Sequence, residues 1–319
     1  MTDFPEKDLS ELDAAERFLP EQPSRRLAPN AATGTFRSWS VNAPPQHVEC
    51  GDGVTKYGQR FVWTAEHLTA DQLAPLRLRG DLLMDAALPA GEGGDCLAQL
   101  DAAALADPSG AAAELLRHAS SPPEWVDWEL LALGQAVYRR YLPLASVVLY
   151  HLSLVGGFSA PKISKVLSST GYLTAAPPAV MQRLLETGRM LIDCCTASDA
   201  LRPRGVGWSS ALRVRALHAR VRRRLLRSKW DTNEWGVPIN QEDLAVTLLA
   251  FSTNVINGCE IILGSAWPAQ EQSAYLHLWR YVGWLLGVAD DCNPCAGSVG
   301  RAQATTVGRA QTYLHWHHS

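Results

Sequence analysis

The chain carries no large excess of charge of either sign. Its 29 Lys and Arg residues nearly balance 32 Asp and Glu residues, which gives a formal net charge of −3. Such a balance creates no overall attraction to nucleic acid or to an anionic membrane. The arginines of residues 213–227 could contact phosphates, but they form one solvated helix face on a slightly acidic protein. We therefore expect no nucleic-acid partner.

The cysteine pattern of a secreted disulfide protein is also missing. The seven cysteines are odd in number and widely scattered, which favours free thiols in a reducing compartment. The first residues contain no apolar segment of the signal-peptide kind, so we expect an intracellular protein, cytoplasmic or peripheral to a membrane. Cys292 and Cys295 have CxxC spacing, and His315, His317 and His318 follow. Without a second CxxC or an HxxxH pair, zinc binding is the weaker interpretation of these residues.

Alternating strand patterns and internal repeats are absent as well, and helical patterns dominate from residue 76 onward. The sequence therefore predicts an all-α fold with a single large helical domain at 76–290. Residues 1–75 hold seven prolines and are predicted to form an irregular arm, and 291–319 to form a loop and tail. The predicted helices are 77–88, 124–142, 145–158, 161–170, 177–197, 210–229, 244–263 and 273–290.

The strongest apolar run, 244–263, is a candidate for a membrane-spanning helix. It contains Asn254, Asn257 and Glu260, and no aromatic belt marks its ends. A membrane span needs about 20 predominantly apolar residues. We therefore interpret this run as a buried core helix rather than a membrane anchor, with Asn240 and Asp243 as its N-terminal cap.

One histidine stands among the apolar residues of an arginine-rich helix, 210–229. His218 shares a face with Val214, Leu217, Val221 and Leu225, because these residues recur at helical spacing. Arg215 lies three residues before His218 and Arg222 four residues after it, at the predicted border of the buried face. An imidazole in apolar surroundings with guanidinium groups beside it suits a ligand for a metal inside an anionic macrocycle. The alternative is a core histidine hydrogen-bonded to a carbonyl.

A second helix, 179–197, places polar and soft apolar residues on one face. These are Arg183, Thr187, Met190 and Cys194. A few donors among apolar contacts suit the wall of a substrate pocket. The alternative is an ordinary helix edge on which Arg183 is solvated and loosely paired with Glu186.

The order and spacing of several segments resemble the rubber oxygenase (latex-clearing protein) family, which also includes ER-bound oxygenases of fungal meroterpenoid pathways. The Arg-Leu-x-x-Thr run lies some thirty residues before the histidine helix, as in that family. Together the similar segments span about residues 76–290. They are GDLLMDAAL (80–88), SAPKISKVLSSTGYL (159–173), RLLET (183–187), LHARVRRRLL (217–226), LAVTLLAFS (244–252) and LWRYVGWLLGV (278–288).

The resemblance implies a globin-like helical core that holds haem b, with His218 as the ligand of the haem iron. Arg183 and Thr187 would then line the opposite side of the haem, where O₂ and a carbon–carbon double bond meet. Arg215 or Arg222 could neutralise a haem propionate through a charge-assisted contact. The cofactor would carry out the oxygen chemistry, while the protein orients a lipophilic substrate and excludes water.

The chain departs from the family at two places, which limits the residue roles that the resemblance implies for it. Rubber-cleaving members place a lysine just before the distal threonine, whereas this chain has Glu186. They also use a glutamate base about one helix upstream of the arginine, whereas no Asp or Glu occurs here between Glu129 and Glu186. Either Glu186 replaces that base, or the reaction involves no proton abstraction, or the activity of this chain differs from that of the rubber-cleaving members. These departures favour a small terpenoid or another lipophilic substrate over polyisoprene.

Three functions of different classes therefore follow from the sequence. The first is a haem-dependent oxygenase that acts on an unsaturated lipophilic compound with O₂. The second is a haem-binding or sensor protein that has lost turnover, which the missing upstream carboxylate motivates. The third is a cofactor-free helical interaction protein whose arginine face binds an acidic partner.

Overall fold

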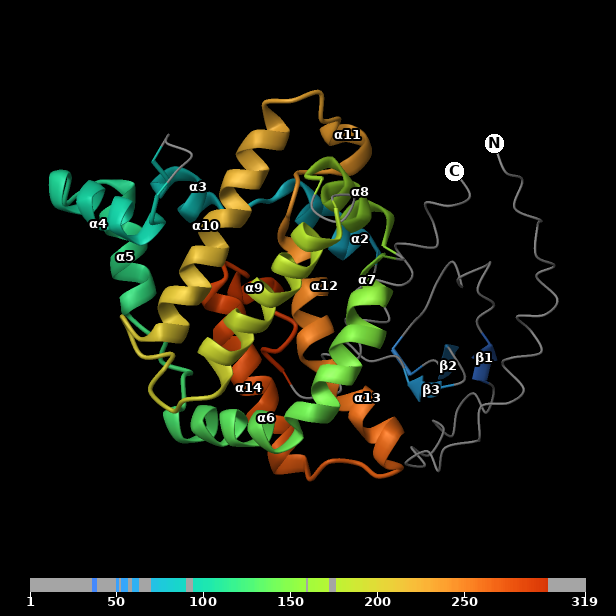
Figure 1. Ribbon diagram of the computed structural model, residues 1–319. Coiled ribbons are helices and arrows are strands. Elements are labelled where there is room, and N and C mark those ends of the chain that lie inside the picture. The colour runs from blue at the N-terminus through green and yellow to red at the C-terminus, as the bar shows by residue number, and fades with distance from the viewer. Residues whose placement is uncertain are drawn as a thin grey trace.

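Helices make up the body of the protein in the computed structural model (Figure 1). The structure describes residues 50–51, 70–89, 94–158, 160–171 and 176–297, together with three short strands between residues 36 and 62. The predicted all-α fold is confirmed for this body. The remaining residues of the predicted arm, and the tail beyond 297 with its three histidines, lie outside the described part of the chain.

The helical elements follow one another with short connections. The short elements are α2 (Ala70–Leu73), η2 (Ala74–Leu78), α3 (Leu82–Ala87), α7 (Val155–Phe158), α11 (Thr232–Trp235) and η4 (Asp290–Cys292). The longer elements are α4 (Cys96–Ala106), α5 (Ala111–Ser120), α6 (Trp128–Val148), η3 (Leu149–Leu154), α8 (Pro161–Ser169), α9 (Pro177–Cys195), α10 (Val206–Leu226), α12 (Gln241–Phe251), α13 (Thr253–Leu263) and α14 (Ala269–Leu285).

A small sheet precedes the helices. Strands β1 (Phe36–Ser38) and β2 (Gly53–Lys56) are parallel, and β3 (Gln59–Val62) pairs antiparallel with β2. The expectation that the chain has no strands is wrong for this segment. Strands of three or four residues are too short for an alternating pattern to stand out in the sequence.

The centre of the helical body is α14, which is buried on every side between Ala274 and Leu285 except at His277 and Arg280. A helix that is apolar all round belongs in the core. Its closest neighbour is α6, and Gly134 of α6 is the point of nearest approach. A Cβ atom at Gly134 would lie 2.3 Å from the carbonyl oxygen of Ala274. The absence of a side chain at this position therefore sets the distance between the two helices.

Replacing Gly134 with alanine is expected to lower the free energy of unfolding by about 1–3 kcal/mol, because the helices must separate to admit a methyl group. Gly188 of α9 is the matched control, since a Cβ there would meet nothing within 4 Å. Gly188→Ala is expected to stabilise the protein by about 0.5–1 kcal/mol, the ordinary helix preference for alanine. Urea unfolding of the two variants measures both effects, and equal effects would contradict the close-packing argument.

Pro143 lies inside α6, and the helix continues through it instead of ending there. Figure 1 shows the long helix changing direction between α6 and α7. Proline accounts for such a bend, because it lacks the N–H that would bond to the preceding turn. The helix then widens into one π-helical segment, η3, before it ends in α7.

The predicted helix 244–263 forms two helices. Asn240 caps the first of them as expected, in a reciprocal arrangement with Asp243. The break falls at Ser252, whose hydroxyl donates to the Leu248 carbonyl at 2.8 Å, and α13 follows at once. Leu244, Ala245, Leu248 and Leu249 of α12 and Val255, Ile256 and Cys259 of α13 belong to the core, whereas Ile261, Ile262 and Leu263 at the end of α13 are exposed. The interpretation as a core helix rather than a membrane anchor stays a prediction.

Two helical stretches are long and apolar enough to cross a membrane, Trp128–Phe158 and Gln241–Leu263. This test considers length and composition only, and helices of a protein core pass it too. In the most apolar window of the first stretch 17% of the residues are buried, against 44% in the second. The sequence analysis considered only the second, although the first is the more exposed.

Candidate functional site

Helix α10 carries His218 at the border between a buried face and a half-buried face. The residues buried along α10 include Arg215, Ala219 and Arg222. Val214, Leu217 and Val221, which the sequence predicts to face the core beside His218, are only partly covered. The predicted placement is therefore wrong in part, because the two arginines lie inside the protein and these three apolar residues lie at its edge, whereas Leu225 of the same predicted face is buried.

The imidazole of His218 is held neutral by its surroundings. Burial lowers its pKa to about 4, and the positive charge of Arg222 acts in the same direction against a smaller opposing effect of Asp81. Its Nδ1 atom is buried and has no hydrogen-bond partner among the described residues. The alternative of a core histidine satisfied by a carbonyl therefore finds no support at this atom. A neutral imidazole without a fixed partner can offer its lone pair to a metal.

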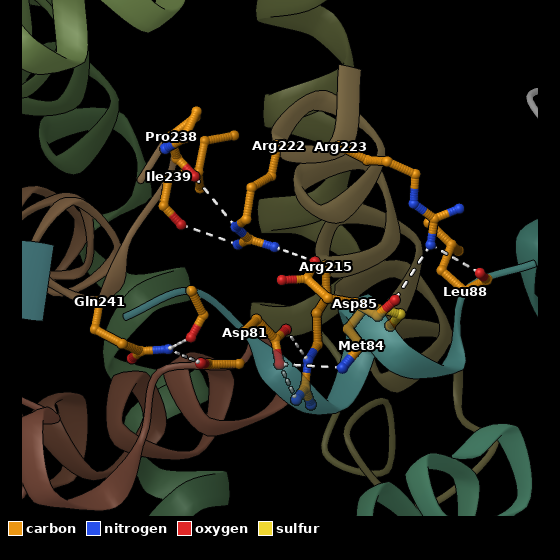
Figure 2. A network of polar contacts seen from close by, with 12 residues as sticks. Asp81, Met84, Asp85, Leu88, Arg215, Arg222, Arg223, Pro238, Ile239 and Gln241 are labelled. Atoms are coloured by element: carbon orange, nitrogen blue, oxygen red, sulfur yellow. Dashed lines mark hydrogen bonds and ion pairs between the residues drawn. The ribbon is translucent and has the colours of Figure 1, made fainter. Parts of the chain in front are cut away.

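Arg215 makes a two-point ion pair with Asp81, the residue that caps α3. Its Nε donates to Asp81 Oδ2 at 2.6 Å and its Nη2 donates to Oδ1 at 2.9 Å. Both side chains are 5% exposed. The guanidinium is thus matched by a carboxylate of this chain, deep in the protein (Figure 2).

Arg222 is bound at all three of its nitrogen atoms (Figure 2). Nη1 donates to Asp85 Oδ1 at 2.5 Å, while Nε and Nη2 donate to the carbonyl oxygens of Pro238 and Ile239 at 3.1 and 2.9 Å. The predicted contact of Arg215 or Arg222 with a haem propionate stays a prediction. Their partners in the structure favour a structural role for both.

Helix α9 carries the other predicted site residues near its exposed end. Arg183 is half-buried, and its Nη1 donates to Glu186 Oε2 at 2.6 Å. Thr187 is exposed, and its hydroxyl donates to the Arg183 carbonyl at 3.1 Å. Further along the same face Met190 and Cys194 are buried. This face of α9 is therefore buried in the core at its Cys194 end and accessible to solvent at its Arg183 end.

Helices α9 and α10 pack tightly where the chain turns between them. Cys194 Sγ lies 3.5 Å from the Gly207 carbonyl oxygen, and a Cβ at Gly207 would lie 2.6 Å from the Asp193 carbonyl oxygen. Figure 1 shows the two helices close together at this turn and diverging toward their other ends. Arg183 and His218 lie on the diverging parts, on neighbouring helices.

These features fit haem better than a metal ion held by several side chains. In the part of the chain that the structure describes, no three His, Cys, Asp or Glu side chains come together as a metal-ligand set. Iron in haem needs one or two protein ligands, whereas a structural zinc site needs about four. The orphaned Nδ1 of His218 and the half-covered apolar residues beside it are consistent with a flat, apolar group at this place.

The CxxC pair does not gather further ligands within the described chain. Cys292 and Cys295 are buried, and their Sγ atoms lie 3.3 Å from Gln241 Oε1 and Ser252 Oγ. The three histidines that the zinc interpretation needs lie outside the described residues. That interpretation stays a prediction.

Sequence analysis missed Asp81 and Asp85. The signal lies in GDLLMDAAL, where two carboxylates four residues apart share one face of an otherwise apolar helix. Arg215 and Arg222 stand seven residues apart, two turns of α10. Two acids on one helical segment and two arginines on one face of another indicate a pair of helices joined by ion pairs.

Comparison with known proteins locates the chain among oxygenases. Residues 139–306 match the family model described as ER-bound oxygenase mpaB/B'/Rubber oxygenase, catalytic domain. A curated relative, the rubber oxygenase of Streptomyces sp. (strain K30), is 28% identical over 198 residues, which cover 61% of this chain and 47% of that protein.

A solved structure titled latex clearing protein LCP in the closed state shares the fold. The TM-score is 0.53 at 22% identity, and the match covers 74% of this chain and 58% of that one. The chain thus spans about half the length of the relatives it matches.

Proposed function

Because the chain belongs to the family of ER-bound oxygenases mpaB/B' and rubber oxygenases, we propose that it is a haem b-dependent oxygenase acting on a carbon–carbon double bond of an isoprenoid or other lipophilic substrate. One alkene and one O₂ give two carbonyl products, so the reaction balances without an added reductant. Bound haem would supply O₂ binding and activation. The protein would supply the axial ligand, the orientation of the alkene and the exclusion of water.

The observation that carries this proposal is the environment of His218. The imidazole is neutral, its Nδ1 is buried without a partner among the described residues, and the apolar side chains beside it are half-covered. We assign His218 as the ligand of the haem iron. Val214, Leu217 and Val221 would pack against the porphyrin.

On α9, the Arg183 guanidinium would donate hydrogen bonds to the molecule bound at the haem, and the Thr187 hydroxyl would orient it. Glu186 already accepts a hydrogen bond from Arg183, so it is placed to take a proton from a group that Arg183 orients. We propose Glu186 as the base of the reaction if one is needed. No other Asp or Glu lies between it and Glu129.

A second candidate function is haem binding without turnover. The missing upstream carboxylate favours it, because no Asp or Glu occurs between Glu129 and Glu186. In this case the chain would sense or carry haem and release no carbonyl product.

Two measurements on the full chain test the proposal. Reconstitution with haemin is expected to give a Soret band and a pyridine haemochrome of haem b in a one-to-one ratio. The ferrous protein is then incubated with O₂ and a panel of isoprenoids from small terpenoids to polyisoprene. Carbonyl products, trapped as hydrazones, support the oxygenase. Haem binding without any carbonyl product would support the second candidate, and absence of a Soret band would end both.

Arg183→Ala and Thr187→Ala are expected to retain haem and to lower turnover, by about 10²-fold for the arginine, as for loss of one fixed donor in an oxygen-stabilising site. Arg189→Ala is the matched control. Arg189 lies on the same helix and pairs with Asp193, so its removal should leave turnover unchanged. Loss of haem from the Arg183 variant would contradict the assigned side of the haem.

A further inference from the structure

We propose that Asp81 and Asp85 are positioning residues for the axial histidine, acting through their ion pairs with Arg215 and Arg222. These pairs fix α10 against α3 on both sides of His218 and thereby fix the place of the imidazole. The inference rests on the proposed function, since it concerns a ligand of the haem iron.

The two ion pairs bracket His218 along α10. Arg215 lies one turn before the histidine and Arg222 one turn after it. Both acids come from one short segment, in which Asp81 caps α3 and Asp85 lies within it. One rigid element therefore holds the histidine turn at two points.

Arg223 adds a third attachment of α10 to the same helix. Its guanidinium donates to the carbonyl oxygens of Asp85, Leu88 and Pro89 at 3.2, 2.8 and 3.0 Å. These carbonyls lie at and beyond the end of α3, where backbone acceptors have no partner within the helix. Three arginines of α10 thus bind one segment of 9 residues, 81–89.

Two glycines let the backbone come close to the ion pairs. A Cβ at Gly80 would lie 3.1 Å from Arg222 Nε and 3.2 Å from Asp85 Oδ2. A Cβ at Gly287 would lie 2.4 Å from Asp81 Oδ2 and 2.7 Å from Arg215 Nε.

Gln241 ties these glycines together, because its Nε2 donates to the Gly80 and Gly287 carbonyls at 3.2 and 3.0 Å (Figure 2). The backbone at Gly80 and Gly287 therefore lies directly against the two ion pairs.

This arrangement matters for position because the faces of α10 beside His218 are covered unequally. The face with Arg215, Ala219 and Arg222 is buried, whereas Val214, Leu217 and Val221 on the other side are half-covered. The contacts of the buried face therefore hold the histidine turn more firmly than those of the half-covered face, and the two ion pairs belong to the buried face.

Asp85→Asn in the full chain tests the proposal by haemin titration and by the ferric and ferrous–CO spectra. Asp85 is the better target because its side chain is 32% exposed and asparagine can still accept a hydrogen bond. The dissociation constant for haemin is expected to rise about tenfold or more, as for loss of an outer partner of a metal ligand, with a shifted ferrous spectrum. Near-UV circular dichroism confirms that the variant is folded.

Asp95→Asn is the matched control. Asp95 also caps a helix, α4, and binds Arg213 of α10 through the same two nitrogens as Asp81 binds Arg215, but at the surface. This variant should bind haemin within about twofold of the unmodified protein, the limit of independent sites.

A variant without His218 distinguishes an effect of Asp85 on the position of this histidine from an effect on the stability of the fold. In His218→Gly supplied with imidazole, the iron ligand is no longer attached to α10. Adding Asp85→Asn there should change the haemin affinity by about twofold at most. An undiminished effect in this background would show a merely structural role and overturn the proposal.

If Asp85→Asn does not fold, Asp85→Glu takes its place. Arg222 Nη1 and Asp85 Oδ1 already lie 2.5 Å apart, so the extra methylene must displace Arg222, and weaker haemin binding with a shifted spectrum is expected again. Unchanged affinity and spectrum in a folded variant of either kind would overturn the inference while the proposed function stands. Failure of the unmodified protein to bind haemin would overturn both.

Discussion

Replacing His218 with alanine is expected to abolish the Soret band under conditions that saturate the unmodified protein with haem. The reason is that alanine has no group that can bind iron, so the haem loses the protein ligand that the proposal assigns to it. Stability of the apoprotein should change little, because the imidazole Nδ1 makes no hydrogen bond to the described part of the chain. Reconstitution followed by the pyridine haemochrome assay measures the loss.

Two other histidines serve as controls for this result. His151 is exposed on η3, and His277 Nε2 accepts the backbone N–H of Asp127 at 3.0 Å. His151→Ala should leave both haem and stability unchanged. His277→Ala should cost stability through the lost hydrogen bond and still retain haem. A normal Soret band in His218→Ala, or its loss in either control, would contradict the assignment of the iron ligand.

Local patterns in the sequence predict the elements of this fold and the candidate residues well. Apolar spacing places α9 and α10 within a few residues of their ends, and Asn240 with Asp243 marks the start of α12. Such signals depend on neighbours within one or two turns, which the sequence displays directly. The resemblance to the rubber oxygenase family, which spans most of the helical body, was confirmed by the comparisons.

The burial of α10 could not be predicted in the same way. Helical spacing shows that Val214 and His218 share a face, but not which element covers that face. Arginines are rarely buried unless they are paired, so the sequence predicts Arg215 and Arg222 at the border of the buried face. Their partners, Asp81 and Asp85, stand more than 130 residues earlier in the chain. Only the tertiary structure brings these charges together.

The ion pair between Asp81 and Arg215 is expected to be the most costly to break. Asp81→Asn should lower the free energy of unfolding of the apoprotein by about 3–5 kcal/mol, because it leaves the charge of a 5% exposed arginine without its carboxylate. The helix cap is kept, since the amide oxygen can still accept the N–H of Met84. The loss of stability therefore measures the effect of the unpaired charge of Arg215 and not the loss of the helix cap.

The pair between Asp95 and Arg213 makes this prediction sharp, because it uses the same two nitrogen atoms of the arginine, at 3.2 Å each, and its side chains are about half exposed. Asp95→Asn should cost about 0–1 kcal/mol. Adding Arg215→Met to Asp81→Asn should recover part of the stability, since no unpaired charge then stays buried. Urea unfolding measures the free energy of unfolding of all three variants, and the dependence of this free energy on urea concentration should be unchanged. Equal losses for the two single variants would mean that Arg215 reaches water when its partner is removed, and that burial does not determine the strength of this attachment of α10.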